Sequence, residues 1–420
     1  TDSIWHQART SQGYYDVGPA KLVVLFANKP YVDVRNTFNS FTPASIPSDL
    51  RKKLINFYMN KLKEHPELQD KVEFEILYTC YDLTFDERSK ELLKSDFTQE
   101  EINELKNALI NITNNLILNS ESSINTDLNN NKEMEFFRKD KEFYLINNRK
   151  NPKVLINTAL ELINDCKKNG TLQFSRLARL AFIGKIILKS LVKEEIINQS
   201  DYDSFLNSIS TIATSINLDF MLFSQNKLGK DDFLDKYGHL RPGTYDITSM
   251  TYNNNPKILE KTSEIFLETK NKNDFILDKN LKMRIDEELK DNNLKFNSSY
   301  LLNFIKRSLE ARELSKFEFT KTLSYALELI AEAGSMLGFS RQEMAQLDID
   351  LLLKINEYDD LKIKDIWGDV INSRNKKKDI YKKMILPPII FSETDFEIIP
   401  TYINKPNFIT RKKLNAQIIN

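Results

Sequence analysis

The sequence contains few of the residues on which several common kinds of site depend. It has 420 residues but only ten glycines, two cysteines and three histidines. Neither a GxGxxG nor a GxxxxGKS/T motif occurs, which argues against the usual dinucleotide and phosphate loops. Cys80 and Cys166 are too few for a disulfide framework or a cysteine zinc site, and no HExxH motif is present. We therefore expect no metal site in this chain, and a reducing compartment.

The charges of the chain cancel, with 60 Lys and Arg against 60 Asp and Glu. Such a balance argues against nucleic acid as a partner and against a polybasic membrane anchor. The most apolar stretch, 177–192, is interrupted by Arg179, Lys185 and Lys189, so it is predicted to be an amphipathic helix and not a membrane span. No signal peptide is visible, and we expect a cytoplasmic protein. Because the chain starts at Thr1 and not at methionine, we expect it to be part of a longer polypeptide.

The hydrophobic pattern predicts a mainly α fold with a small N-terminal α+β unit. Within residues 1–95, apolar or alternating runs predict strands over 21–27, 31–34 and 72–78, and Ser48 is predicted to cap a helix over 48–62. Residues 96–385 are predicted to form a multi-helix domain, to which the resemblance described below assigns substrate binding. Residues 386–420 contain four prolines and are predicted to form an extended strap, because proline interrupts helices.

Helical spacing dominates after residue 95. Capping boxes at Thr98 and Ser340 mark two of the helix starts. The polar stretch 114–132 is predicted to be a mobile loop. The predicted helices are 98–118, 133–148, 152–168, 173–194, 197–212, 229–236, 255–268, 281–290, 297–313, 315–337, 340–356 and 361–384.

The most unusual segment is 233–252, FLDKYGHLRPGTYDITSMTY. Its two glycines and one proline predict a structured turn that presents Tyr237, His239, Arg241 and Asp246. Turns rich in such groups often carry function. A rigid connector between two helices, with Asp246 as a cap, explains the same residues, and the pattern does not decide between the two interpretations.

A second candidate is the run Arg312-Glu313-Leu314-Ser315-Lys316. Arg312 and Lys316 are four residues apart on a predicted helix and so share one face, where they could hold a phosphoryl group. Glu313 could orient a cation or act as a base. From the residues alone a solvated helix face is the favoured interpretation, since such charged pairs are common.

Two further segments carry weaker candidates. Asp33 and Arg35 would share one face of a strand, with Asn39 in the turn that follows, although an ion pair between the two charges is somewhat favoured. Arg179 lies at the basic edge of a predicted core helix whose small residues permit close packing. Both segments could contribute a polar group to a pocket.

Six segments in this order resemble the central region of the phosphoenolpyruvate-synthase-like phosphotransferases. They are YVDVRNTFNSF, KVEFEILYTCYDL, GTLQFSRLARLAFIG, FLDKYGHLRPGTYDI, the run 312–317 and KPNFIT. The resemblance is greatest to the bacterial glutamine kinases of capsule phosphoramidate synthesis, and more distant to the rifampin phosphotransferases. It implies a helical acceptor-binding domain between an ATP-grasp domain, which residues 1–95 would follow, and a swivelling domain with a phosphorylated histidine, to which the strap 386–420 would lead.

The resemblance also implies the reaction and the residues that carry it. ATP with Mg²⁺, bound outside this chain, would phosphorylate the mobile histidine, which would pass the phosphoryl group to the amide nitrogen of glutamine. Arg312 and Lys316 would hold that group, with Glu313 and His239 beside it. Asp33, Arg35, Asn39, Arg179, Tyr237, Arg241 and Asp246 would bind the acceptor. A rifamycin-type substrate or a non-catalytic helical docking scaffold are the alternatives, and alone this chain is expected to be inactive.

Overall fold

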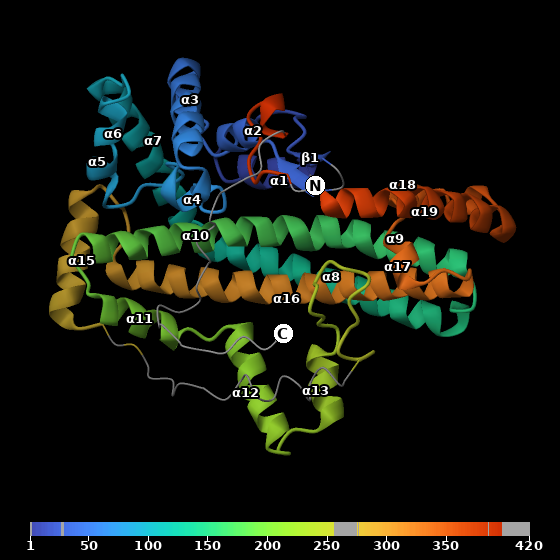
Figure 1. The fold of residues 1–420 in the computed structure, drawn as a ribbon. Helices are drawn as coiled ribbons and strands as arrows, with labels where there is room; N and C mark the ends of the chain where they lie inside the picture. The colour runs from blue at the N-terminus through green and yellow to red at the C-terminus, as the bar shows by residue number, and fades with distance from the viewer. Residues whose placement is uncertain (1, 27–28, 256–274, 276, 385, 397–420) are drawn as a thin grey trace, which may run out of the picture.

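The computed structural model describes residues 2–26, 29–255, 275, 277–384 and 386–396 of the chain. These residues are mainly helical, and a small two-stranded hairpin lies near the N-terminus, so the predicted fold class is confirmed (Figure 1). The hairpin pairs β1 (Val23–Phe26) with β2 (Lys29–Val32) in antiparallel register. Among the described helices, none has the length and apolar character needed to cross a bilayer.

Three long helical rods form the centre of the molecule (Figure 1). The first is α8 (Ser120–Asn148). The second consists of α9 (Pro152–Cys166), the π-helical segment η2 (Lys167–Thr171) and α10 (Leu172–Lys193) in succession, and the third is α16 (Ser298–Met336), which packs against both others. Gly184 allows α10 and α16 to approach closely, because a Cβ atom there would lie 3.1 Å from Cγ1 of Ile305. This agrees with the close packing predicted from the small residues of 170–184.

Shorter elements surround the rods. Before α8 these are α1 (Asp2–Thr10), α2 (Val34–Asn39), α3 (Ser48–Glu64), η1 (Pro66–Leu68), α4 (Val72–Glu75), α5 (Phe85–Arg88), α6 (Lys90–Leu93) and α7 (Gln99–Leu118). After α10 they are α11 (Gln199–Ser208), α12 (Ile212–Ser224), α13 (Lys230–Tyr237), α15 (Lys279–Asp291), α17 (Arg341–Met344), α18 (Ile349–Leu353), η3 (Ile355–Glu357), α19 (Asp360–Lys383) and η4 (Glu393–Phe396). Both predicted capping boxes, at Thr98 and Ser340, are present.

Two large apolar cores lie on the rods. The larger one joins side chains of the N-terminal helices, such as Phe38 and Leu54, to Ile187 of α10 and Leu301 of α16. It therefore continues across the predicted domain boundary at residue 95. The second core is formed where α8, α9, α16 and α19 meet, around Leu155, Leu329 and Trp367. Because α16 contributes to both cores, it connects the two ends of the molecule.

The strand predicted over 72–78 is wrong. Residues 72–75 form the short helix α4, and the chain then continues without a partner strand. Ile76, Leu77 and Tyr78 are all buried in succession, which a half-exposed strand with a period of two does not allow. The backbone N–H of Tyr78 donates instead to the hydroxyl of Tyr58, at 3.0 Å.

The mobile loop predicted over 114–132 is also wrong, because these residues belong to α7 and α8. Many of their polar side chains are exposed, but several are buried and have partners. Asn114 accepts from the backbone N–H of Lys295 at 2.8 Å, and Asn131 donates to the carbonyl of Asn169 at 2.8 Å. The polar composition indicates buried hydrogen bonds here and not disorder.

Several helices begin or end at residues other than those predicted. The helices 297–313 and 315–337 are one helix, α16, while 340–356 is divided into α17, α18 and η3. The helix at 48 has Pro47 and not Ser48 as its cap residue, without a side-chain cap bond. The helices α1, α2 and α12 were not predicted. The predicted helix 255–268 lies, apart from residue 255, outside the described residues.

The segment after α19 returns to the hairpin, which is distant from it in sequence. The hydroxyl of Tyr31 donates to the carbonyl of Pro387 at 2.6 Å, and the rings of Phe26 and Phe396 lie 5.6 Å apart. Residues 386–392 form no helix, as predicted for the strap, and η4 follows. The rest of the strap, including KPNFIT, lies outside the described residues.

Candidate functional site

A cavity of about 950 Å³ opens between α8, α16, α17 and the turn that follows α13. Its volume is at the upper end of the range for small-molecule sites, about 300–1,000 Å³. Charged and polar groups dominate its wall. On one side these are Glu135, Arg138, Lys139 and Glu142 of α8, with Arg149 directly after that helix. The others are His239, Thr251, Asn253 and Asn254 of the turn, Lys321, Ser324, Tyr325, Glu328 and Glu332 of α16, and Arg341 of α17. It is thus a polar cavity with acids and bases on every side.

His239 is the one predicted site residue in this wall. Its ring packs edge-on against Phe317, with the ring centres 4.8 Å apart, and its Nε2 atom is buried without a hydrogen-bond partner among the described residues. Burial, followed by the positive charges of Lys321, Arg138 and Arg241, lowers the pKa of His239 to about 3. The imidazole is therefore neutral at physiological pH.

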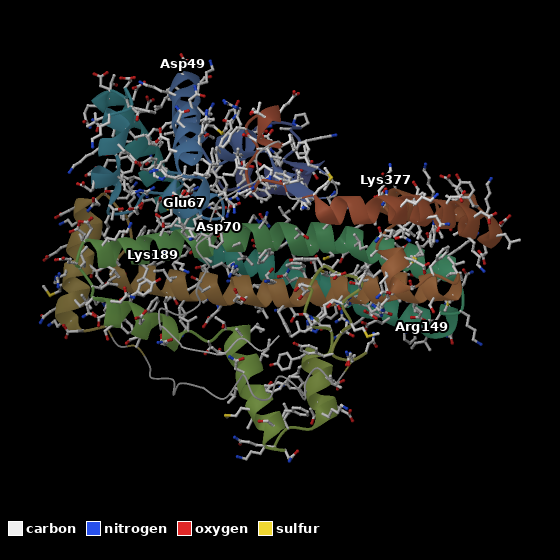
Figure 2. All side chains as sticks on the ribbon, viewed as in Figure 1. Asp49, Glu67, Asp70, Arg149, Lys189 and Lys377 are labelled. Atoms are coloured by element: carbon white, nitrogen blue, oxygen red, sulfur yellow. The ribbon has the colours of Figure 1, made fainter. Side chains whose placement is uncertain are left out.

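The charges of the cavity are paired with one another. Glu328 accepts from Arg241 at 2.9 Å, from Arg341 at 3.0 Å and from the amide of Asn254 at 2.5 Å. Arg149, at the lower right in Figure 2, pairs with Glu332 at 2.6 Å. A ligand with one positive and one negative group could separate such a pair and bind both of its members, so that no charge in the cavity would lose its partner.

The remaining charged residues of the wall on α8 and α16 are also paired with opposite charges. Lys139 is bound to Glu135 at 2.8 Å, and Arg138 contacts Glu142. Lys321 pairs at 2.9 Å with Glu318, which is on its own helix.

The turn itself is held rigidly on α16 by Arg241. This side chain is buried and donates to the carbonyl and hydroxyl oxygens of Ser324 at 3.1 and 2.8 Å, and to the carbonyl of Ser249 at 3.1 Å. Gly238 has no room for a side chain, since a Cβ atom would lie 2.4 Å from the carbonyl oxygen of Leu234. Arg241 therefore stabilises the turn, and its bonds to the turn and to α16 leave it no free role in ligand binding.

Tyr237 and Asp246 also have local partners. The hydroxyl of Tyr237 donates to Asp219 at 2.9 Å, and its ring is buried outside the cavity wall. Asp246 accepts from the backbone N–H of Thr248 at 2.8 Å. The rigid-connector interpretation therefore describes these two residues and Arg241, while His239 alone faces the cavity.

Arg312, Glu313 and Lys316 do not line the cavity that holds His239. Arg312 and Lys321 are nine residues apart on α16, and at about 100° per residue they lie on opposite sides of the helix. The guanidinium of Arg312 contacts Glu313 and lies 5.6 Å from the ring centre of Phe182 on α10. Lys316 is half-buried one turn further along. The three residues therefore lie outside the cavity wall, although Phe317, which follows Lys316, packs against the rings of Tyr237 and His239.

The surroundings of Arg312 contain two lysines that the sequence analysis did not single out. The pKa of Lys185 on α10 is lowered, first by partial burial and then by the charges of Lys189 and Arg312. Lys189, labelled in Figure 2, lies on the same helix. Three cations, Lys185, Lys189 and Arg312, therefore act on one another where α10 and α16 meet.

The three predicted residues of the N-terminal unit are distant from the cavity wall and have other roles. Asp33 is not on a strand: it caps α2 by accepting from the backbone N–H of Asn36 at 2.9 Å. Arg35 lies on α2, is exposed and donates to Asn56 at 3.3 Å. The predicted shared strand face and the Asp33–Arg35 pair are therefore wrong, because the strand ends at Val32. Asn39 is the last residue of α2, and its carbonyl accepts from Thr42.

Arg179 is fully buried and its donors are used within the protein. It donates to the hydroxyl of Tyr14 at 2.9 Å, to Glu73 at 2.8 Å and to the hydroxyl of Thr79 at 2.5 Å. Each of its three side-chain nitrogens has a partner and the side chain is 0% exposed, so a substrate carboxylate does not reach it. Arg179 is a structural link between α10 and the N-terminal unit.

Sequence reasoning missed most of the cavity wall, especially Arg138, Lys321, Glu328 and Arg341. One signal was available on α16, where polar residues recur at 321, 324, 325, 328 and 332, a spacing that puts them on one side of a helix. No signal indicated that α8 would contribute the opposite wall. Within the described part of the chain, no group of three or more His, Cys, Asp or Glu is placed to hold a metal ion.

Comparisons of the chain with protein-family models, with curated proteins and with solved structures find no match.

Proposed function

We propose that this chain is the acceptor-binding part of an ATP-dependent phosphotransferase, and that a zwitterionic amino acid, with glutamine favoured, binds in the cavity beside His239. The sequence resemblance suggests the class of reaction. The observation that carries the proposal is a neutral histidine with an unpartnered Nε2, next to Lys321 and Arg138, in a cavity of about 950 Å³.

The mixed charge of the cavity favours an amino acid over a rifamycin. An α-carboxylate would be bound by an arginine or lysine of the wall, and an α-ammonium by a glutamate such as Glu328 or Glu332. A large apolar antibiotic would instead leave these groups desolvated and without new partners, which is unfavourable.

The proposed chemistry assigns roles to three residues. A phosphohistidine from another module loses its P–N bond as a new P–N bond forms to the acceptor's amide nitrogen, which releases one proton. Lys321 and Arg138 would neutralise the equatorial oxygens of the transferred group. His239, once its ring turns toward the acceptor, would accept the amide proton, and the arriving negative charge would raise its pKa during the transfer. ATP and Mg²⁺ would act only outside this chain.

Calorimetry of the chain with glutamine, other amino acids and a rifamycin tests the binding step. We expect glutamine to bind, the affinity to fall roughly 2–12-fold in His239→Gln, where one neutral hydrogen bond is lost, and about 10–150-fold in Lys321→Ala, where a charged one is lost. Lys377→Ala, on the exposed face of α19 (Figure 2), is the matched control. Failure of every amino acid to bind would contradict the proposal.

The transfer step distinguishes the two candidate phosphoryl sites. In the complete polypeptide, Lys321→Ala and Arg138→Ala should lower transfer by orders of magnitude and leave phosphohistidine formation intact. If Arg312→Ala and Lys316→Ala have this effect instead, the phosphoryl group is held at the α10–α16 face, as the resemblance alone implies. Loss of phosphohistidine formation in these variants would contradict an acceptor-site role.

A docking scaffold is the second candidate, and one surface favours it. Phe136, Phe143 and Ile146 are 69%, 75% and 71% exposed on α8, and they lie on one side of that helix. Apolar groups gathered in this way are typical of protein-interaction surfaces. A scaffold would bind no small molecule in the calorimetric experiment, so the same measurement separates the two functions.

A further inference from the structure

A second cavity, of about 300 Å³, lies between the end of α1, the junction of α7 with α8, and α10. It is separate from the cavity of His239, because no residue lines both. Its volume is at the lower end of the range for small-molecule sites. A ligand here would therefore be small.

The floor of this cavity is an ion pair whose carboxylate is buried and whose arginine side chain is 24% exposed. Asp127 of α8 is almost fully buried, with 2% of its side chain exposed, and accepts from Nε of Arg176 at 3.2 Å and also from its Nη2. Burial raises the pKa of Asp127, and the guanidinium of Arg176 opposes that shift. Gln12 donates to the backbone carbonyl of Arg176 at 3.0 Å and holds α1 against the floor.

A partly buried ion pair of this kind is weak evidence for stability, since the cost of desolvating two charges offsets most of their attraction. Its position at the floor of a cavity suggests a second use. The pair has no net charge, but it presents carboxylate acceptors and guanidinium donors close together. Such a floor suits a neutral ligand with several hydroxyl groups, each of which can donate and accept.

The rim agrees with a neutral ligand. Six exposed, uncharged polar residues surround the floor: Ser11, Asn115, Asn119, Ser122, Ser123 and Thr126. Leu116 and Leu180 supply the apolar part of the wall. No charge other than Asp127 and Arg176 lines this cavity, which contrasts with the many charges around His239.

We propose that this cavity binds a small, neutral, polyhydroxylated molecule of the monosaccharide class. Hydroxyl groups of the ligand donate to Asp127 and accept from Arg176, while the amides and hydroxyls of the rim bind the remaining hydroxyls. The C–H face of the ring packs on Leu116 and Leu180. This site is independent of the proposed phosphotransfer, because it shares no residue with the first cavity.

Saturation-transfer NMR on the chain with glucose, galactose, N-acetylglucosamine and glycerol tests the site, with glutamine and inorganic phosphate as charged probes. We expect at least one sugar to bind at millimolar concentration. The double variant Asn119→Ala/Thr126→Ala removes two exposed rim groups and should weaken binding by about tenfold or more, as expected for two hydrogen bonds. Asp127→Asn should abolish binding.

Asn129→Ala, which is exposed on α8 outside the cavity, is the matched control and should bind the sugar normally. Circular dichroism establishes that each variant is folded, and the rim variant keeps the test valid if Asp127→Asn unfolds. The proposal is overturned if no sugar binds, if the rim variant binds as tightly as the parent chain, or if only the charged probes respond to these substitutions.

Discussion

At the scale of single residues, two arginines illustrate how surroundings decide a role. Arg179 and Arg312 lie on the neighbouring rods α10 and α16, and both were candidates for anion binding. The donors of Arg179 are taken by Tyr14, Glu73 and Thr79. Among the carboxylates that the structure describes, Arg312 contacts only Glu313, and its side chain is 28% exposed. The first is structural, and the second is available to a ligand.

Replacement of Arg179 by alanine should therefore destabilise the protein. The change removes the cation bound to the hydroxyls of Tyr14 and Thr79 and leaves Glu73 with Arg9 alone among the described cations, at 3.6 Å. We expect a loss of about 3 kcal/mol in the free energy of unfolding, the lower end of the range for a broken buried pair. Urea titration followed by circular dichroism measures it. Arg35→Ala, at an exposed site on α2, is the control and should change stability by less than about 0.5 kcal/mol. An unchanged stability in Arg179→Ala would show that the buried links do not hold the fold.

His239 should make stability depend on pH. Its pKa is about 3 in the folded protein against about 6.5 for an ordinary histidine, so between these values the unfolded chain binds a proton that the folded chain does not. Stability is therefore complete above about pH 6.5 and falls as the pH drops toward 3. The urea midpoint should fall less between about pH 7 and about pH 5 in His239→Gln than in the parent chain.

NMR titration of the His239 ring gives an independent check. Lys321, Arg138 and Arg241 are the cations whose charges act on it. A ring that titrates at its ordinary value would contradict the burial and the neutral state on which the proposed transfer depends.

At the scale of elements, two glycines in helices have opposite surroundings. A Cβ atom on Gly170, in the π-helical segment η2, would lie 2.7 Å from Cβ of Phe319 and 3.0 Å from the sulfur of Met134. A Cβ atom on Gly368, in α19, would meet nothing within 4 Å. The first glycine is required by packing between the rods, whereas the second only weakens its helix.

These contacts predict effects of opposite sign for the same substitution. Gly170→Ala should destabilise by about 1–3 kcal/mol, because the rods must move apart. Gly368→Ala should stabilise by about 0.5–1 kcal/mol, because alanine loses less backbone entropy in a helix. Thermal unfolding of both variants in parallel measures the difference. Stabilisation by Gly170→Ala would contradict the close contacts of η2, and destabilisation by Gly368→Ala would contradict the open surroundings of Gly368.

At the scale of the whole molecule, the hairpin and the segment after α19 connect parts of the chain that are about 350 residues apart in sequence. The bond from Tyr31 to the carbonyl of Pro387 is central to this contact. Tyr31→Phe should cost about 0.5–1.5 kcal/mol of local stability. We expect faster hydrogen exchange and proteolysis in residues 386–396, with the rods unaffected. Unchanged protection there would show that the hydroxyl does not hold the segment.

The helical class, most of the long helices and the two capping boxes could be predicted from the amino-acid pattern, because helical periodicity and cap chemistry are local properties. The pattern also identified the turn around His239 as unusual. It did not show that 114–132 is helical or that 72–78 is not a strand, since buried partners such as Lys295, Asn169 and Tyr58 come from distant segments.

The packing of the helices establishes which candidate residues lie together, and no local pattern could predict it. The helical repeat of α16 places Arg312 on the side opposite Lys321. The packing of α8 against α16 places Arg138 in the same cavity wall as His239. Likewise, Asp127 and Arg176 meet at the floor of the second cavity although 49 residues separate them in sequence. A binding site depends on the distances between side chains of different helices, and those distances are set by how whole helices pack and not by the pattern within any one of them.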